Sequence, residues 1–419
     1  MKEANKLNLE KSFKEFELAK TLIPGGVAGI RRPYNFVPGE YPIYFEKGKG
    51  CRITDLDGNE YIDYLCAYGP IILGYREEEV DNAVIKQIQE KGFCFSLTQR
   101  HQDLLAKKLT EIIPCAQMCS FVMTGSDATS LSIRHARSYT GKKKVMRCGY
   151  HGWHDWCVEV KGGIPEKLYE DIHEFKYNDL DELEQLLKQY KDDVAAVIIT
   201  PLGHPLAMKI QEPKKGYLEA VKDLTHKYNA VLIFDEIRTG FRVSMGGAQK
   251  YYGVTPDVAV FGKAMANGYP IGVVVGREDI MKEGESHVFV SSTFFPNSLG
   301  YIAALKTIEI LERDKVLDKI WEKGKSFNDG VKKTLNKYEM VGAEFSGIDP
   351  MMFITFKKDP DNIYKQKRNE FYTQLIRRKV FLQPYHHGYI CYRHTKDDLD
   401  YTLNAIEESL AYLKEKYHR

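Results

Sequence analysis

The sequence predicts an α/β fold, with a mostly parallel central sheet, helices on both of its faces and a smaller α+β domain. From about residue 80, short apolar runs alternate with helical patterns, which is typical of parallel strands joined by helices. The apolar runs lack strict alternation, as expected for strands that are buried on both faces. A chain of 419 residues is too long for one small core and predicts two or three packed subdomains.

Residues 1–70 are predicted to form an N-terminal segment. A helical pattern covers roughly residues 8–22, and a Pro-Gly-Gly turn follows it at residues 24–26. Residues 50–63 predict a β-hairpin, because an Asp-Gly-Asn turn at residues 57–59 separates two arms of alternating apolar residues.

Residues 71–310 are predicted to form the large α/β domain, and residues 311–419 the smaller α+β domain. The six strand candidates of the large domain are residues 120–124, 144–148, 194–200, 231–234, 258–261 and 271–275, with helical patterns such as residues 127–139 and 216–228 between them. The remaining expectations are a long helical stretch from about residue 300 to 335, strands near residues 352–356 and 389–392, and a last helix over residues 396–416.

Composition argues against several classes of partner. Lys and Arg number 60 against 58 Asp and Glu, and no basic run reaches five residues, so we expect binding to neither nucleic acid nor an anionic membrane. The charged N-terminus lacks the apolar region of a secretory signal, and no apolar run approaches 18 residues, so no membrane-spanning helix is expected. Eight scattered cysteines without a CxxC pair predict reduced thiols in a cytoplasmic protein and no metal site.

The residues that follow each predicted strand are the candidates for a ligand site, because open α/β sheets bind ligands at the carboxyl ends of their strands. Gly125 and Ser126 come directly after the first candidate strand and open a helix. Glycine permits close approach to the backbone, and the free N–H groups of a first helical turn attract an anion such as phosphate. The alternative interpretation of this pair is an ordinary helix cap.

Tyr150 and His151 follow the second candidate strand, within a Gly-Tyr-His-Gly-Trp-His segment. An aromatic side chain at a strand end can lie flat on a ligand ring, and the flanking glycines leave room for that ring. Core aromatic residues are one alternative. A metal pair formed by His151 and His154 is another, although no neighbouring residue clearly supplies a third ligand.

Asp235 and Lys263 follow two later candidate strands. A partly buried carboxylate needs a cationic partner, and a protonated pyridine nitrogen is one, while a helix cap or a metal ligand is the alternative. A lysine that is desolvated near other cations has a lowered pKa and suits Schiff-base chemistry, while a solvated loop lysine is the alternative. Together and in this order, the strand-end residues are the set that a pyridine aldehyde bearing a phosphate requires.

Motifs spread over nearly the whole chain carry a family resemblance. They are Leu22-Ile-Pro-Gly-Gly-Val27 with Arg31-Arg32, Asp57 to Tyr64, Tyr68-Gly-Pro70, Asp235-Glu-Ile-Arg-Thr-Gly-Phe-Arg242, Gly253 to Asp257, Phe261-Gly-Lys-Ala264, Pro270-Ile-Gly272, Ser292-Thr293 with Asn297, and His394 to Asp398. In these motifs the sequence resembles the class III aminotransferases, which depend on pyridoxal 5′-phosphate (PLP), and most closely the glutamate-1-semialdehyde aminomutases among them.

The resemblance implies a fold-type I PLP enzyme. Lys263 would hold PLP as a Schiff base and shuttle the proton, and Asp235 would pair with the pyridine nitrogen. The other implied cofactor ligands are Tyr150, stacked on the ring beside His151, and Gly125 and Ser126, which would hold the phosphate.

The resemblance also implies a homodimer with shared active sites. Thr293 would reach the phosphate bound in the other subunit. Arg32 would bind a substrate carboxylate, and Tyr68 would line the substrate pocket.

The sequence departs from the aminomutase pattern at three places, and the first two departures favour transamination over aminomutation. Only about twenty residues separate Trp156 from Tyr177, so the mobile loop that retains an intermediate is shortened or missing. Thr200 stands where the family has an active-site glutamate. Arg238 stands where other members have Gln or Met, and it would either bind an anionic or polyhydroxylated substrate or form a surface ion pair.

The sequence therefore predicts a PLP-dependent transaminase that moves an amino group from an amino-acid donor to an aldehyde or keto acceptor by a ping-pong mechanism. Arg238, His386, His387 and the 27 tyrosines suggest a sugar-type acceptor as a further hypothesis. The rival predictions are a glutamate-1-semialdehyde 2,1-aminomutase of tetrapyrrole synthesis and a non-catalytic binding protein on the same fold.

Overall fold

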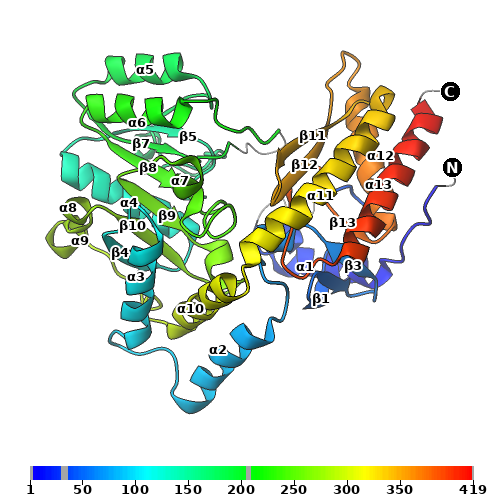
Figure 1. Cartoon of the computed structure of the whole chain (residues 1–419), viewed down its shortest axis with the longest axis horizontal. Coiled ribbons are helices and arrows are strands. Elements are labelled where there is room, and N and C mark those ends of the chain that lie inside the picture. The colour runs from blue at the N-terminus through cyan, green and yellow to red at the C-terminus, as the bar shows by residue number, and fades with distance from the viewer. Residues whose placement is uncertain (1–2, 30–35, 204–208, 418–419) are drawn as a thin grey trace. The chain divides into compact units, whose positions relative to one another are not determined.

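The computed structural model describes residues 3–29, 36–203 and 209–417, and these form two compact units (Figure 1). The first unit contains the described residues up to Glu77, residues 209–210 and the chain from Asp318 onward. The second unit contains the described residues from Glu78 to 203 and from Gln211 to Leu317. Each unit has its own sheets and core, and the two are described separately.

A seven-stranded sheet forms the centre of the second unit, in the order β4-β10-β9-β8-β7-β5-β6. Neighbouring strands are parallel except around β10, which runs antiparallel to both β4 and β9. This arrangement confirms the predicted mostly parallel α/β sheet. The strands are β4 (Met118–Val122), β5 (Lys144–Cys148), β6 (Ile172–Glu174), β7 (Val194–Ile199), β8 (Val231–Asp235), β9 (Val258–Phe261) and β10 (Gly272–Gly276).

Both faces of this sheet are buried, which explains why its strands are apolar without alternation. Ile198 and Ile233 pack on one face in a cluster with Leu131 of α4 (Gly125–Thr140). Val197 and Leu232 alternate with them along the strands, point to the other face and are also fully buried. The other helices of this unit are α2 (Glu78–Glu90), α3 (Arg100–Ile112), α5 (Leu180–Gln189), α6 (Tyr217–Lys227), α7 (Gly247–Tyr252), α8 (Glu278–Met281), α9 (Glu283–Ser286) and α10 (Ser298–Arg313).

The first unit contains two smaller sheets, in the orders β1-β2-β3-β13 and β11-β12-β14. The predicted hairpin over residues 50–63 is confirmed as the antiparallel pair of β2 and β3, with Ile53 opposite Tyr61. The strands are β1 (Phe45–Lys49), β2 (Arg52–Asp55), β3 (Glu60–Asp63), β11 (Ala343–Ile348), β12 (Met351–Phe356), β13 (Val380–Phe381) and β14 (Gly388–Tyr389). Its helices are α1 (Glu10–Leu22), α11 (Val316–Lys337), α12 (Ile363–Arg377) and α13 (Lys396–Tyr417).

The predicted single helical stretch from residue 300 to 335 is wrong in one respect, because it is two helices. α10 ends at Arg313 and α11 begins at Val316. Between them Lys315 takes a φ of 48°, a left-handed conformation that stops the α-helix from continuing.

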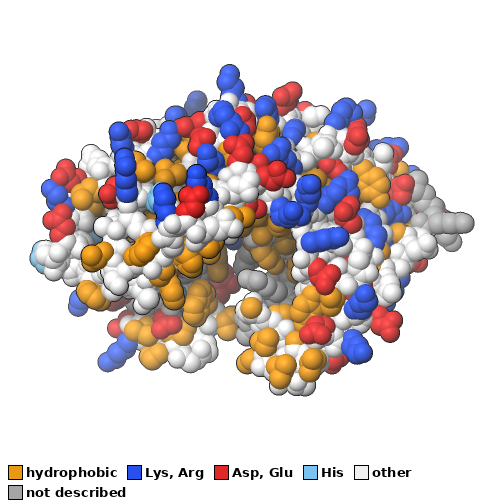
Figure 2. All heavy atoms as spheres, turned by 90° about the horizontal axis from the view of Figure 1, so that it is seen from below, with side chains coloured by type: hydrophobic (Ala, Val, Ile, Leu, Met, Phe, Trp, Pro, Cys, Tyr) orange, Lys and Arg blue, Asp and Glu red, His pale blue; other side chains and the backbone are white. Residues whose placement is uncertain are grey.

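No helix in the described parts of the chain is long and apolar enough to span a membrane. On the face seen in Figure 2, basic and acidic side chains are interspersed over much of the surface, and hydrophobic side chains gather along its lower part. The mixed charges agree with the nearly balanced composition.

Candidate active site

Lys263 begins a short turn, η5 (Lys263–Ala266), directly after β9. Its φ of 45° is left-handed, which costs free energy for a residue with a side chain and is common where function fixes the backbone. Desolvation, and then the positive charges of Arg238 and Arg242, lower the pKa of Lys263 to about 7, against the opposing charge of Asp235. Within the described chain, no carboxylate lies within ion-pair distance of Lys263. The amine of Lys263 is therefore about half neutral at pH 7, and its neutral form is a nucleophile.

Asp235 is the last residue of β8, and it is paired with His151. Nδ1 of His151 lies 2.8 Å from Oδ2 of Asp235, and both side chains are buried. The other carboxylate oxygen, Oδ1, accepts a hydrogen bond of 3.1 Å from the N–H of Ile237. These two contacts fix the plane of the carboxylate and offset part of its desolvation cost.

Two glycines shape the segment that carries Tyr150 and His151. Gly149 has a φ of 118°, and a Cβ there would lie 2.7 Å from Oγ1 of Thr200. Gly152 has a φ of 117°, and a Cβ there would collide with Oγ of Ser126. Glycine is thus required at both positions for conformation and for space. The segment can pack tightly on the neighbouring strand and on the start of α4.

The N-terminus of α4 is capped in a way that leaves its first N–H groups for another partner. Thr124 and Asp127 form a capping box, in which each side chain accepts a hydrogen bond from the backbone N–H of the other. The N–H groups of Gly125 and Ser126 lie in the first turn, where no carbonyl of the same helix can reach them. Oγ of Ser126 accepts a bond of 3.3 Å from the N–H of Trp153. Both predictions for this pair, a helix start and an anion cradle, are compatible with this geometry.

Tyr150 and Arg238 lie against each other at the surface of this region. The Arg238 guanidinium carbon is 5.9 Å from the centroid of the Tyr150 ring, which is within cation–π range. Tyr150 is 40% exposed, so part of its ring is open to a ligand. Arg238 also contributes to the lowered pKa of Lys263. The structure thus brings Arg238 into the electrostatic environment of the lysine.

Glu236 and Arg242 are functional-site neighbours that the sequence analysis did not single out. Glu236 is fully buried and accepts hydrogen bonds from the N–H groups of Ala248 and Gln249, at 2.8 and 2.9 Å, and from the Thr239 hydroxyl. It holds in place the segment that follows Asp235. Burial raises the pKa of Glu236, while these bonds oppose the rise. In the sequence, Glu236 and Arg242 could have been found only because they belong to the same motif as Asp235.

The remaining predicted residues lie elsewhere. His154 faces Ser130, with 2.7 Å between its Nδ1 and the hydroxyl, rather than sharing a ligand position with His151. Thr293 is exposed in the segment between α9 and α10 of the second unit. Tyr68 belongs to the first unit, where its ring makes an edge contact with His386 at 5.1 Å. Arg32 lies outside the described residues.

The residues present fit a bound PLP group. Lys263 supplies an amine without a competing carboxylate, and Asp235 supplies an oriented anion beside it. The first turn of α4 supplies N–H groups suited to a phosphate. Nε2 of His151 is buried and has no hydrogen-bond partner among the described residues. A bound ligand could form a hydrogen bond with this nitrogen.

Comparisons with known proteins agree with this chemistry. The family model described as "Aminotransferase class-III" matches residues 36–407. A 3-aminobutyryl-CoA aminotransferase of Cloacimonas acidaminovorans is 64% identical, over 98% of this chain and 99% of that protein. A glutamate-1-semialdehyde 2,1-aminomutase of Archaeoglobus fulgidus is 34% identical, over 96% of this chain and all of that protein. The expected closest resemblance to the aminomutases is therefore wrong, because the aminotransferase is far more similar.

Solved structures give the same result. The FumI protein of Sphingopyxis sp. MTA144, in its PLP-bound form, has a TM-score of 0.92 and 28% identity, with 97% of each chain covered. An omega-transaminase from Sphaerobacter thermophilus has a TM-score of 0.87 and 25% identity, covering 96% of this chain and 98% of that one. The family match spans most of the sequence, and the residues at the described strand ends fit the family's cofactor. The chain belongs to the class III aminotransferases and is a PLP-dependent enzyme of fold-type I.

Proposed function

We propose that this enzyme transfers the amino group of a β-aminoacyl thioester, of the 3-aminobutyryl-CoA type, to a keto-acid acceptor. The observation that carries the proposal is the 64% identity, over nearly the full length of both chains, to a 3-aminobutyryl-CoA aminotransferase. The sugar-type acceptor has no support among the relatives described above, and we do not propose it.

In this proposal Lys263 is the catalytic base and acid. Its amine, with a pKa near 7, would remove the proton from the carbon that bears the substrate's amino group and deliver it to the carbon that is the aldehyde carbon of free PLP. Bound PLP supplies the electron sink that makes such a proton removable. Asp235 keeps the pyridine nitrogen protonated, and His151 positions Asp235 through the 2.8 Å contact.

We propose the other cofactor contacts in the second unit as well, and the geometry of α4 and of the segment after β5 supports them. The N–H groups of Gly125 and Ser126 would bind the phosphate at the start of α4, and Tyr150 would stack on the ring. We further propose that Thr293 reaches the phosphate bound in a second copy of the chain. The exposure of Thr293 in the segment before α10 is compatible with that contact.

Substrate recognition is proposed to use Arg238, Tyr68 and Arg32. Arg238 lies beside Tyr150, and its guanidinium can donate hydrogen bonds to the carboxylate of the keto acid in the second half of the reaction. The acyl carbonyl of a thioester is neutral, and the neutral side chain of Thr200 stands where the family has an acid, so no carboxylate at that position would repel the keto acid. Tyr68 would line the pocket, and Arg32 would bind a carboxylate.

The decisive experiment compares amino donors with the purified holoenzyme. We expect 3-aminobutyryl-CoA with 2-oxoglutarate to yield acetoacetyl-CoA and glutamate, with a kcat/KM at least about tenfold higher than that for free 3-aminobutyrate. A free β-amino acid that reacts as well as its thioester would contradict the proposal.

A second candidate activity is aminomutation of glutamate-1-semialdehyde, favoured by the 34% identity to aminomutases over 96% of this chain. We expect no formation of 5-aminolevulinate from glutamate-1-semialdehyde, since the retaining loop is short and Thr200 replaces the acid. Formation of that product at a rate matching the thioester reaction would favour the aminomutase instead.

We also propose that the enzyme is a homodimer of the cytoplasm. Two large apolar side chains of the second unit, Phe95 and Leu97, are exposed in the segment after α2. Such side chains are typical of a surface that is covered in an assembly. No disulfide joins any of the eight cysteines, all of which lie in the described parts of the chain, and this suits a reducing compartment. Light scattering on the eluting protein should give twice the 48.2 kDa chain mass.

A further inference from the structure

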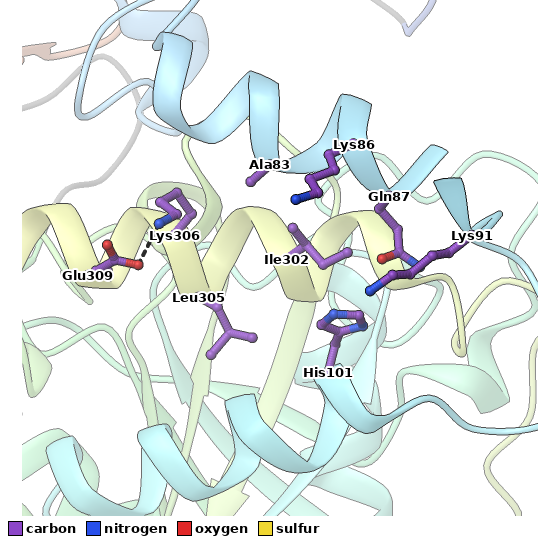
Figure 3. Close-up of a pocket in the computed structure, with 9 residues that line it drawn as sticks. All are labelled: Ala83, Lys86, Gln87, Lys91, His101, Ile302, Leu305, Lys306 and Glu309. Atoms are coloured by element: carbon purple, nitrogen blue, oxygen red, sulfur yellow. Dashed lines mark hydrogen bonds and ion pairs between the residues drawn. The ribbon is translucent and has the colours of Figure 1, made fainter. Parts of the chain in front are cut away.

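A cavity of about 260 Å³ lies in the second unit, between α2, the start of α3 and α10 (Figure 3). No residue predicted for the cofactor site lines it. The charged and titratable side chains of its lining are Lys86, Lys91, His101, Lys306 and Glu309.

The cavity is positively charged. Lys86 and Lys91 are exposed, and neither has a carboxylate within ion-pair distance in the described part of the chain. The single acidic side chain of the lining, Glu309, is already paired with Lys306 at 2.6 Å. Figure 3 shows the amine of Lys91 pointing toward His101, and burial followed by the Lys91 charge lowers the pKa of that imidazole. Two cations thus remain to neutralise an anionic ligand.

One wall of the cavity is apolar, although its rim is charged. Ile302 and Leu305 come from the same face of α10, and Ala83 of α2 lies opposite them. Gln87 is buried and donates a hydrogen bond of 2.8 Å to the carbonyl of Gly92, which holds it in place at the edge. An apolar wall beside free cations suits a ligand with a flat ring and phosphate groups.

Helix α10 connects this cavity to the turn that carries Lys263. α10 packs against η5, and Gly300 approaches the carbonyl of Pro270 so closely that a Cβ there would lie 2.6 Å from it. The cavity residues occupy another face of the same helix. The cavity is therefore separated from the Lys263 turn by about the width of one helix, roughly 10 Å.

We propose that this cavity binds the 3′-phosphorylated ADP end of a coenzyme A thioester, with Lys86 and Lys91 on its phosphates and the apolar wall against its adenine. The inference rests on the proposed function, which supplies a substrate whose nucleotide end is anionic and lies far from its reacting carbon. The extended pantetheine arm between these ends spans the width of a helix. The cavity would thus add affinity for the thioester without touching the chemical step.

The test compares two thioesters of 3-aminobutyrate, one on coenzyme A and one on N-acetylcysteamine, which lacks the nucleotide. We expect Lys86→Gln and Lys91→Gln each to raise KM for the CoA thioester about threefold, and the double variant about tenfold, with kcat unchanged. The KM for the N-acetylcysteamine thioester should stay unchanged in every variant. Lys107→Gln is the matched control, because Lys107 is an exposed lysine of α3 that does not line the cavity.

Direct binding provides a second measurement. Adenosine 3′,5′-bisphosphate should bind the holoenzyme in a calorimeter, compete with the CoA thioester and bind about tenfold more weakly to the double variant. Inorganic phosphate that competes equally well would overturn the nucleotide assignment.

The remaining outcomes separate this inference from the proposed function. An unchanged KM for the CoA thioester in the double variant would overturn the cavity assignment and leave the proposed function standing. An equal rise of KM for both thioesters would also overturn it, since the lysines would then act on the fold or the reacting end. Failure of the wild-type enzyme to use either thioester would refute the proposed function itself, whatever the variants do.

Discussion

Nδ1 of His151 and Oδ2 of Asp235 lie 2.8 Å apart, although 84 residues separate them in the chain. The two side chains come from the ends of β5 and β8, with β7 lying between these strands in the sheet. His151 therefore reaches over one strand to hold the carboxylate. The pair forms one oriented unit, and its two members have different roles.

Replacing the carboxylate of Asp235 by an amide should remove its negative charge while keeping the size and shape of the side chain. We expect Asp235→Asn to lower kcat by about 100-fold or more, because an amide cannot keep a pyridine nitrogen protonated. Steady-state kinetics on folded, PLP-loaded protein measures the effect. Asp155→Asn, an exposed change on the segment after His154, should keep full activity. An Asp235→Asn enzyme with near-normal kcat would refute the role of this carboxylate.

His151 should behave as a positioning residue. We expect His151→Gln to lower kcat about tenfold, less than Asp235→Asn does, and to shift the absorption maximum of the bound cofactor, because the carboxylate loses one of its two fixed partners. The combined variant should be no worse than Asp235→Asn alone, since both changes act on the same unit. Additive losses in the double variant would contradict this prediction.

The pKa of Lys263 predicts a pH-dependent stability of the cofactor-free enzyme. The pKa is lowered from 10.5 to about 7 on folding, so the unfolded chain binds more protons between these pH values. Burial of this lysine therefore lowers the free energy of unfolding most at and below pH 7, and the loss shrinks as the pH rises toward 10. We expect Lys263→Met to raise the unfolding temperature at pH 7 by a few degrees, roughly, and the difference to shrink toward pH 10.

Scanning calorimetry at several pH values checks this. Lys107→Met, at an exposed position of α3, serves as the control and should give no pH-dependent difference. A stabilisation by Lys263→Met that stays constant from pH 7 to 10 would rule out the titration of this amine as its cause.

Gly152 should be intolerant of any side chain. We expect Gly152→Ala to weaken PLP binding and to lower the free energy of unfolding by about 2–4 kcal/mol, since its φ of 117° is strained for alanine and the new methyl group meets Ser126. Gly163→Ala separates the two causes, because Gly163 has a φ of 80° with open space around it. That control should cost only about 1 kcal/mol and keep PLP binding. Equal effects of the two substitutions would show that the contact with Ser126 is unimportant.

Glu236 should be required for stability. We expect Glu236→Ala to lower the free energy of unfolding by about 3 kcal/mol or more, because the N–H groups of Ala248 and Gln249 would be left buried without an acceptor. Denaturant titration measures the change. Glu236→Gln keeps one acceptor oxygen and should cost less. If Glu236→Ala proved as stable as the wild type, the buried carboxylate would have no structural role.

Much of the fold could be predicted from the sequence, since the strands of the large sheet are short apolar runs that end at polar residues. β5 and β9 occupy the predicted residues, and the hairpin of β2 and β3 follows from its Asp-Gly-Asn turn. The antiparallel direction of β10 could not be predicted, because an apolar run shows that a strand is buried but not which way it runs relative to its neighbours. β6 was missed because it has only three residues, of which Ile172 alone is apolar and Glu174 is exposed and charged.

The site was predictable only in part, for a physical reason. Strand-end order brings Asp235 and Lys263 to one edge of the sheet, but the 2.8 Å contact of His151 depends on a loop whose path is set by Gly149 and Gly152. The charged cavity beside α10 is lined by residues of three helices, and no local sequence pattern predicts that these helices pack together.

Strand β10 has a consequence for the size of what the site can hold. Gly272 lies opposite Val122 on one side of β10, and Val273 lies opposite Phe261 on the other. The end of β4, which leads to Gly125, and the end of β9, which leads to Lys263, are therefore held two strand spacings apart, about 10 Å. This single antiparallel strand thus sets the distance between the start of α4 and the turn that carries the amine of Lys263. A ligand that engages both ends must therefore span the part of this spacing that the side chain of Lys263 does not cover.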